Sequence, residues 1–86
     1  MKYSKDEVCI LIPTLNDGLT IGNVVKEFKA LGYNNILVMD GRSTDNTVKT
    51  ARDAGAVVKT QSGAGKGNAI MEAFEIIEQP YILMLD

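Results

Sequence analysis

The fold is decided by the run Val8-Cys9-Ile10-Leu11-Ile12, in which five apolar residues follow one another without a polar one. Similar runs occupy residues 36–39 and 81–85, and a weaker run with one polar side occupies residues 56–60. A strand that is apolar on both sides is buried on both faces, as in a parallel sheet covered by helices. The four runs therefore predict four strands, the weakest of them at an edge of the sheet.

Helical patterns separate these runs. Residues 21–31 place apolar side chains at helical spacing, with Thr20 as the expected N-cap and Gly32 as the residue that ends the helix. Shorter patterns predict helices over about residues 45–54 and 67–78. The resulting order, βαβαβαβ, predicts one three-layer α/β unit with a parallel four-stranded sheet and right-handed crossovers.

The order of the strands in the sheet decides where a ligand can bind. The common doubly wound arrangement has the order 3-2-1-4, and ligands then bind beyond the carboxyl ends of the strands near the reversal. The loops expected to carry function begin at Pro13, Asp40 and Asp86. The same order leaves residues 81–85 at an open edge and one face under a single helix. We therefore expect self-association through that strand or that face.

Composition excludes several classes of function. The 86 residues include 9 Lys and Arg against 11 Asp and Glu, which offers no basic field for nucleic acid. Histidine is absent, which removes the usual general base and the commonest zinc ligand. No apolar run approaches the ~20 residues that span a bilayer. The single cysteine, Cys9, indicates a reducing cytoplasm.

Two loops combine turn residues with candidate functional groups. The loop Pro13-Thr14-Leu15-Asn16-Asp17-Gly18 suits either a plain strand-to-helix turn or a binding loop. In residues 40–47, a glycine turn and a helix cap account for Thr44 and Asp45. They do not account for Asp40, a carboxylate directly after four apolar residues, which is therefore the stronger functional candidate.

Two further segments have groups that suit phosphate or a cation. Three glycines in residues 63–67 precede a helix, where backbone N–H groups and Lys66 could approach phosphate. The segment departs from a Walker P-loop and also suits a flexible loop. Asp86 follows five apolar residues, where a carboxylate is costly unless it meets solvent, a cation or a ligand. Two strand spacings would separate Asp40 from Asp86 by about 10 Å, which suits the two ends of a nucleotide.

Four blocks in order resemble the signature of family 2 glycosyltransferases, with the dolichyl-phosphate mannose synthase-like branch as the closest match. They are Ile10-Leu11-Ile12-Pro13-Thr14-Leu15-Asn16-Asp17, Met39-Asp40-Gly41-Arg42-Ser43-Thr44-Asp45-Asn46-Thr47, Gly65-Lys66-Gly67-Asn68-Ala69 and Leu83-Met84-Leu85-Asp86. Each block is weak alone, and the specificity lies in their order and spacing. The resemblance implies a GT-A fold, which is Rossmann-like, and a UDP- or GDP-linked sugar as the ligand.

The resemblance also implies roles for individual residues. The loop after the first strand would contact base and ribose, Asp40 would contact the base, and the Gly-Lys-Gly segment would lie beside the donor. The implied nucleotide-sugar-binding residues are Pro13, Thr14, Asn16, Asp17, Asp40, Gly65 and Lys66. Asp86 falls on the first aspartate of the family's Asp-x-Asp motif, whose carboxylates hold Mg²⁺ or Mn²⁺ against the donor diphosphate.

The sequence departs from the family pattern in three places before its end. Leu15 stands where an aromatic residue is usual, Asp17 where glutamate is usual, and Gly41-Arg42 replaces the common Asp-Gly pair. Because the chain ends at Asp86, we interpret residues 1–86 as the N-terminal nucleotide-sugar-binding part of a GT-A domain, truncated at the first aspartate of the motif. We expect this part to be inactive alone. The longer enzyme would transfer a sugar to an acceptor such as polyprenyl phosphate at the cytoplasmic membrane face.

Other interpretations compete with this one. A nucleotidyltransferase shares the layout but places a glycine-rich, arginine-containing loop after the first strand, which residues 13–18 lack. A receiver-like signalling module needs an aspartate at the end of the third strand, where Thr60 stands. A stable α/β fragment, or a small nucleotide-binding or interaction module without enzymatic activity, stays open.

Overall fold

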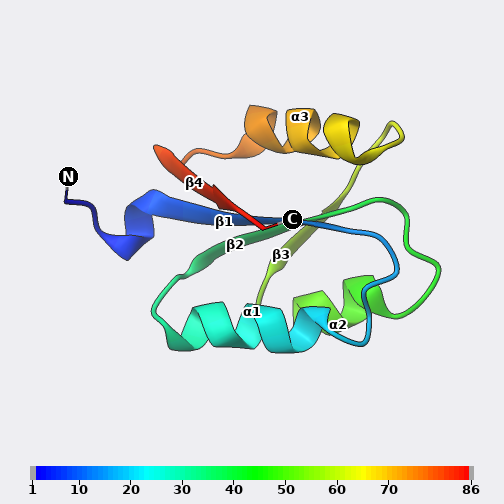
Figure 1. Cartoon of the computed structure of the whole chain (residues 1–86), viewed down its shortest axis with the longest axis horizontal. Coiled ribbons are helices and arrows are strands. Elements are labelled where there is room, and N and C mark those ends of the chain that lie inside the picture. The colour runs from blue at the N-terminus through cyan, green and yellow to red at the C-terminus, as the bar shows by residue number, and fades with distance from the viewer. Residues whose placement is uncertain (1, 86) are drawn as a thin grey trace.

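The computed structural model describes residues 2–85 as a four-stranded parallel sheet with helices between the strands (Figure 1). The strands are β1 (Val8–Thr14), β2 (Asn35–Asp40), β3 (Val57–Thr60) and β4 (Tyr81–Met84). The helices are α1 (Ile21–Ala30), α2 (Thr47–Asp53) and α3 (Lys66–Ile76), and a short 3₁₀ turn, η1 (Lys5–Glu7), precedes the sheet. The order is β3-β2-β1-β4, which confirms the predicted α/β class and the 3-2-1-4 arrangement.

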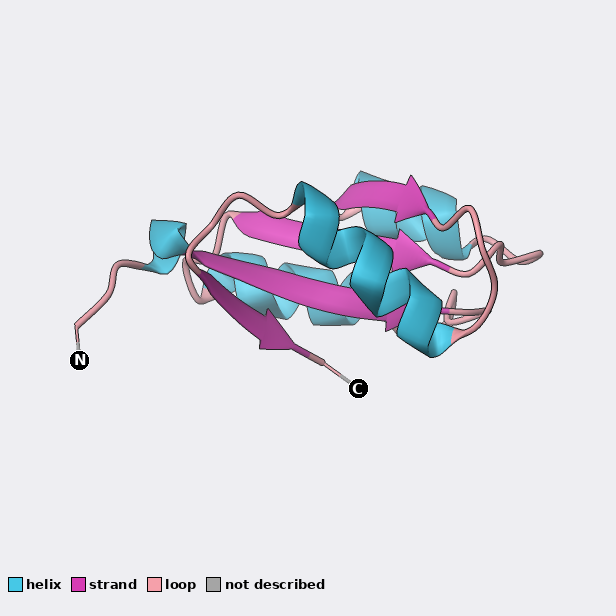
Figure 2. Ribbon diagram, turned by 90° about the horizontal axis from the view of Figure 1, so that it is seen from above, coloured by secondary structure: helices cyan, strands magenta, loops and turns pink. Residues whose placement is uncertain are grey.

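Strand β1 lies at the centre of the sheet and sets the alignment of its neighbours. Viewed from above, all four arrows run the same way, with β3 and β4 at the two edges (Figure 2). The register pairs Ile10 with Ile36 on β2 and with Leu83 on β4. The last pair of β1 and β2 joins Thr14 to Asp40, so these two side chains meet where the strands end.

The helices cover the two faces of the sheet unequally. In Figure 1, α1 and α2 lie below the sheet and α3 lies above it. Ile10 packs in one apolar cluster with Val25 of α1, and Leu11 packs in the other with Ala73 of α3. All four side chains are fully buried. Because successive strand residues point to opposite faces, the unbroken apolar run of β1 supplies both clusters, as predicted.

The helix ends differ from the prediction by at most two residues. Helix α2 begins at Thr47 rather than at residue 45, because the Asp45 carboxylate lies outside the helix and accepts the Thr47 N–H at 2.9 Å. Thr20 occupies the N-cap position of α1, but its hydroxyl makes no capping bond. Gly32 follows α1 with a φ of 97°, which suits a glycine. Within residues 2–85, no helix has the length and apolar character that crossing a membrane requires.

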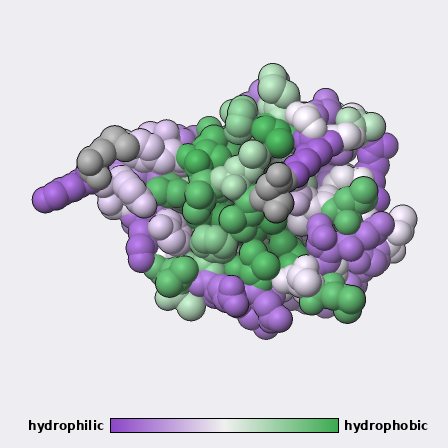
Figure 3. Space-filling view, in the orientation of Figure 1, coloured by the Kyte–Doolittle hydropathy of each residue, from purple (hydrophilic) through white to green (hydrophobic). Residues whose placement is uncertain are grey.

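The β4 edge leaves large apolar side chains uncovered. Ile82, Leu83 and Met84 are 41%, 44% and 43% exposed. In Figure 3, which has the orientation of Figure 1, apolar side chains gather at the centre of this face of the molecule. The expected exposure of this strand is confirmed. An apolar edge of this kind commonly marks a contact surface.

Candidate functional site

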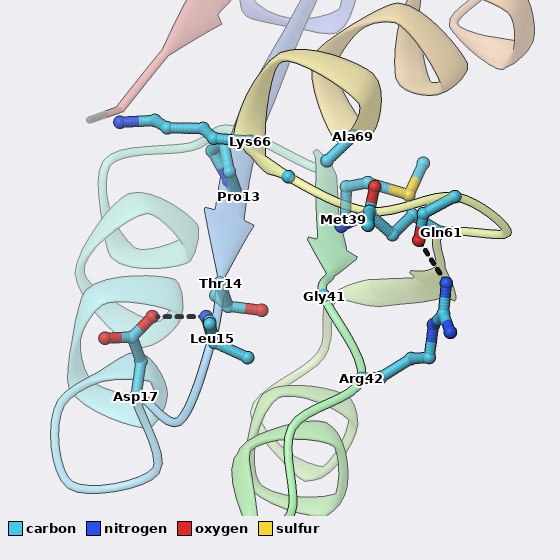
Figure 4. Close-up of a pocket in the computed structure, with 13 residues that line it drawn as sticks. Pro13, Thr14, Leu15, Asp17, Met39, Gly41, Arg42, Gln61, Lys66 and Ala69 are labelled. Atoms are coloured by element: carbon cyan, nitrogen blue, oxygen red, sulfur yellow. Dashed lines mark hydrogen bonds between the residues drawn. The ribbon is translucent and has the colours of Figure 1, made fainter.

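A cavity of about 600 Å³ opens at the carboxyl end of the sheet. Its walls come from the loops that follow β1, β2 and β3 and from the first turn of α3. Figure 4 shows Thr14 and Asp17 on one side of it and Arg42 and Gln61 on the other. Both the volume and the position beyond the strand ends are typical of small-molecule sites in open α/β sheets.

Five of the predicted binding residues line this cavity. They are Pro13, Thr14, Asp17, Gly65 and Lys66. Gly65 has a φ of 87°, and nothing lies within 4 Å of the position that a Cβ would occupy there. A ligand could therefore approach the backbone closely at the start of α3.

Asp40 lies inside the protein, with its carboxylate engaged by neighbouring groups. Its Oδ1 accepts from the Thr14 hydroxyl at 2.8 Å and from the Ser43 hydroxyl at 2.6 Å, and its Oδ2 accepts the Ser43 N–H at 2.7 Å. The residue is only 1% exposed. Although Asp40 is the last residue of β2, its side chain therefore lies in the core and not at the surface. The carboxylate holds Thr14, which does line the cavity.

Asn16 also bonds within the protein rather than lining the cavity. Its side-chain oxygen accepts the backbone N–H groups of Thr44 at 2.9 Å and Asp45 at 3.3 Å, and its own N–H donates to the Ser43 hydroxyl at 2.8 Å. Its φ of 55° is left-handed, a conformation that asparagine tolerates better than most residues. Asn16 thus joins the loop after β1 to the loop after β2.

Asp45 and Thr47 add further bonds between the same two loops. The Asp17 N–H donates to the Thr47 hydroxyl at 2.8 Å, and the Gly18 N–H donates to the Asp45 carboxylate at 3.0 Å. Bonds from the Thr47 hydroxyl and amide, with a smaller contribution from Gly18, lower the pKa of Asp45. The loops after β1 and β2 therefore form one hydrogen-bonded wall rather than two independent loops.

Sequence reasoning missed several residues that line the cavity, and Arg42 is the most informative. Its Nη2 donates to the carbonyl oxygens of Ser62 and Gly63, the latter bond drawn as a dashed line in Figure 4. Its φ is 67°, a conformation that favours glycine. The sequence feature that could have pointed to Arg42 was the departure from the family's Asp-Gly pair, which has glycine at this position. The positive φ explains that glycine.

The described residues do not form a metal site. Among residues 2–85, no three His, Cys, Asp or Glu side chains come together in a way that could hold a metal ion. The carboxylate predicted to bind metal, Asp86, lies outside the described residues. The carboxylates of Asp17 and Asp40 accept hydrogen bonds from protein N–H and hydroxyl groups.

A doubly wound sheet with a cavity beyond its strand ends defines the class of open α/β proteins in which ligands bind at that edge of the sheet. Within that class, the comparisons identify the family. The family model described as Glycosyl transferase family 2 matches residues 9–86. The chain belongs to glycosyl transferase family 2, and the predicted resemblance is confirmed.

Curated relatives of the chain include two with close similarity. Glycosyltransferase AglJ of Haloferax volcanii is 54% identical over 82 residues, which covers 94% of this chain and 27% of that protein. Protein RfbJ of Shigella flexneri is 34% identical over 85 residues, which covers 98% of this chain and 66% of that protein. The chain thus spans between about a quarter and two thirds of the length of these relatives.

Solved structures share the fold. A crystal structure of glucosyl-3-phosphoglycerate synthase from Mycobacterium tuberculosis, in complex with Mn²⁺, UDP-glucose and phosphoglyceric acid, matches with a TM-score of 0.84 and 24% identity. The match covers 92% of this chain and 32% of that chain. The same protein in complex with Mg²⁺ and UDP matches with the same TM-score and identity. At this identity the likeness shows the fold alone, and it confirms the predicted GT-A architecture.

Proposed function

We propose that the cavity at the carboxyl end of the sheet binds the nucleoside diphosphate part of a UDP- or GDP-linked sugar. The observation that carries the proposal is the cavity of about 600 Å³ lined by five of the residues that the family resemblance implies for nucleotide-sugar binding. The solved relative with UDP-glucose supports it as an example of a nucleotide-sugar ligand on the same fold. The ligand would be the sugar donor of a transfer reaction.

Some of the predicted residues would contact the ligand, and others would hold the contacting residues in position. Asp17 and the backbone after β1 would contact base and ribose, and Lys66 with Gly65 would meet the negative diphosphate at the start of α3. Asn16 and Asp40 would act by holding the loops and Thr14 in place, since their side-chain oxygens accept internal hydrogen bonds. This assignment keeps all the predicted residues in the site but moves two of them out of direct contact.

A second part of the proposal concerns the transfer reaction of the whole enzyme. We propose that residues 1–86 are the donor-binding part of a GT-A domain, which the partial coverage of the relatives supports. The motif resemblance supports Asp86 as a ligand of Mg²⁺ or Mn²⁺ and polyprenyl phosphate as the acceptor. The cytoplasm is the proposed compartment, supported by the single buried thiol of Cys9. The 86 residues alone should form no product from a UDP- or GDP-sugar and polyprenyl phosphate, and robust product would contradict this part.

Ligand titration tests the donor-site proposal directly. UDP, UDP-glucose, GDP and GDP-mannose are added to the isotope-labelled chain with Mg²⁺ while backbone amide shifts are recorded. We expect shifts confined to residues 13–18, 40–43 and 61–66. No shift with any of the four ligands at millimolar concentration, which corresponds to about −4 kcal/mol of binding, would refute the proposal.

A matched pair of variants separates binding in the cavity from binding elsewhere. Ala64 is exposed and lines the cavity, so Ala64→Trp should fill the space and abolish the shifts. Ala30 is also exposed but ends α1, before the amino end of β2. Ala30→Trp should therefore leave the titration unchanged. Equal effects of the two substitutions would show that the shifts do not report this cavity.

A second candidate function is that of an interaction module, and the apolar β4 edge favours it. The three exposed side chains of residues 82–84 lie on a strand whose outer backbone edge has no neighbouring strand among the described residues. We propose that two copies associate through this edge, since strand addition would cover both the side chains and the backbone groups. This proposal is independent of ligand binding.

A further inference from the structure

The segment between β3 and α3, residues 61–65, is held on two sides by side chains of opposite charge. The carbonyl oxygens of Ser62 and Gly63 accept from Nη2 of Arg42, at 2.9 Å for Ser62. The N–H groups of Ser62 and Gly63 donate to the Glu72 carboxylate, with shortest distances of 2.9 Å and 3.1 Å. The peptide group that joins Ser62 to Gly63 is therefore bonded at both of its polar ends.

The Glu72 side of this arrangement is anchored on α3. Asn68, one turn earlier on the helix, donates from its amide group to the Gln61 side chain at 2.9 Å and to the Glu72 carboxylate. The Ser62 and Gly63 N–H groups, followed by the Asn68 amide, lower the pKa of Glu72. The carboxylate is thus an anion at neutral pH, and its bonds to the backbone are charge-assisted.

The Arg42 side is kept in a conformation that disfavours a side chain. Its φ of 67° suits the glycine that the family pattern has at this position. The one ion pair among residues 2–85 joins Lys49 to Asp53, so no carboxylate there accounts for the Arg42 guanidinium. A guanidinium presents several N–H groups in one plane and can bond adjacent carbonyl oxygens. A strained conformation that persists at the wall of a cavity points to a role for the side chain.

We propose that Arg42 and Glu72 form a clamp on residues 61–65 that positions Gly65 and Lys66 for the diphosphate of the bound ligand. Arg42 and Glu72 are positioning residues in this proposal, which rests on the proposed donor site. Gly65 and Lys66 lie two and three residues after Gly63, and both line the cavity. An unclamped glycine-containing loop would have to be ordered on binding, which weakens affinity.

The decisive substitution is Arg42→Gly, because it removes the guanidinium and relieves the backbone strain together. If the bonds from Arg42 to the carbonyl oxygens of Ser62 and Gly63 contributed nothing, this variant would resemble the native protein or exceed it in every respect. The clamp instead predicts an unchanged or higher melting temperature together with about tenfold faster amide hydrogen exchange at Ser62 and Gly63. Glu72→Gln should accelerate the same two amides. Arg52→Ala, which removes an exposed arginine of α2, is the matched control.

Ligand binding supplies the second measurement. For Arg42→Gly we expect affinity for UDP to fall about tenfold while affinity for uridine, which lacks the diphosphate, stays unchanged. Unchanged exchange at Ser62 and Gly63, or an equal loss for UDP and uridine, would overturn the clamp. If the native chain binds neither ligand, the donor-site proposal fails and the positioning role fails with it. In that case the exchange rates still decide whether the clamp itself exists.

Discussion

Removing the Asp40 carboxylate should destabilise the whole fold and not only a binding site. Asp40→Ala takes away the acceptor of the Thr14 hydroxyl and of the Ser43 hydroxyl and N–H. Thr14 is 6% exposed, so its hydroxyl would lose its partner inside the protein. An unsatisfied buried donor such as the Thr14 hydroxyl costs about 1–3 kcal/mol. The Ser43 groups cost less, because Ser43 is half-buried and water replaces part of their hydrogen bonding. We therefore expect a loss of about 3 kcal/mol in the free energy of unfolding.

That loss is a large share of what a chain of this size has available. At 0.05–0.15 kcal/mol per residue, 86 residues have a total stability of roughly 4–13 kcal/mol. Asp40→Asn keeps the shape and one acceptor oxygen but faces the Ser43 N–H with an NH₂ group. It should therefore cost about 1–2 kcal/mol, less than Asp40→Ala.

Urea unfolding followed by circular dichroism measures both variants. Asp53→Ala is the matched control, because it removes an aspartate whose side chain is 64% exposed and whose carboxylate pairs with the exposed Lys49. The control should change stability little. If Asp40→Ala costs no more than Asp53→Ala, then the internal bonds do not hold the site as described. An altered dependence on urea concentration would indicate a change in the unfolded or native ensemble instead.

Three further predictions concern acid stability, glycine packing and association. The pKa of Asp45 is lowered in the folded state, so ionised Asp45 stabilises the fold above the usual pKa of 3.8, and this stabilisation is lost as the pH falls through the lowered value. Asp45→Asn should therefore weaken the dependence of the free energy of unfolding on pH in this range, measured by urea unfolding at a series of pH values. A Cβ at Gly18 would lie 2.0 Å from Oδ1 of Asn46, whereas one at Gly67 would meet nothing within 4 Å. Gly18→Ala should therefore lower the melting temperature, and Gly67→Ala, within α3, should raise stability by about 0.5–1 kcal/mol. The native chain should sediment as a dimer at micromolar concentration and Leu83→Lys as a monomer; a monomeric native chain would exclude association through β4.

The sequence was sufficient to predict the architecture because the pattern of buried strands is local. An unbroken apolar run such as residues 8–12 has few alternatives to a strand buried on both faces, and the helical patterns between the runs fix the connections. The strand order was predicted from the common doubly wound arrangement, and the exposed edge at residues 82–84 followed from that order. Helix ends were less accurate, since Asp45 could stand in the first turn of α2 or before it with nearly the same local chemistry.

The site was predicted as a location, and the roles within it were not. Strand ends lead to the cavity, which is why the predicted residues Pro13, Thr14 and Asp17 line it. Gly65 and Lys66, predicted from the glycine-rich segment, line it too. A motif shows that a residue is at the right edge of the sheet. It does not show whether the side chain faces the ligand or a neighbouring loop.

Only the tertiary structure showed which side chains face the cavity and which bond to neighbouring loops. Asp40 meets Thr14 because the register of two parallel strands brings together residues that are 26 positions apart. Arg42 reaches the carbonyl oxygens of residues 62 and 63 for the same reason, across the ends of β2 and β3. Periodicity and motif spacing describe interactions along the chain, so the sequence by itself determined which elements form and at which edge the site lies. Hydrogen bonds between loops depend on distances across the sheet, so only the tertiary structure decided which polar groups remain for a ligand.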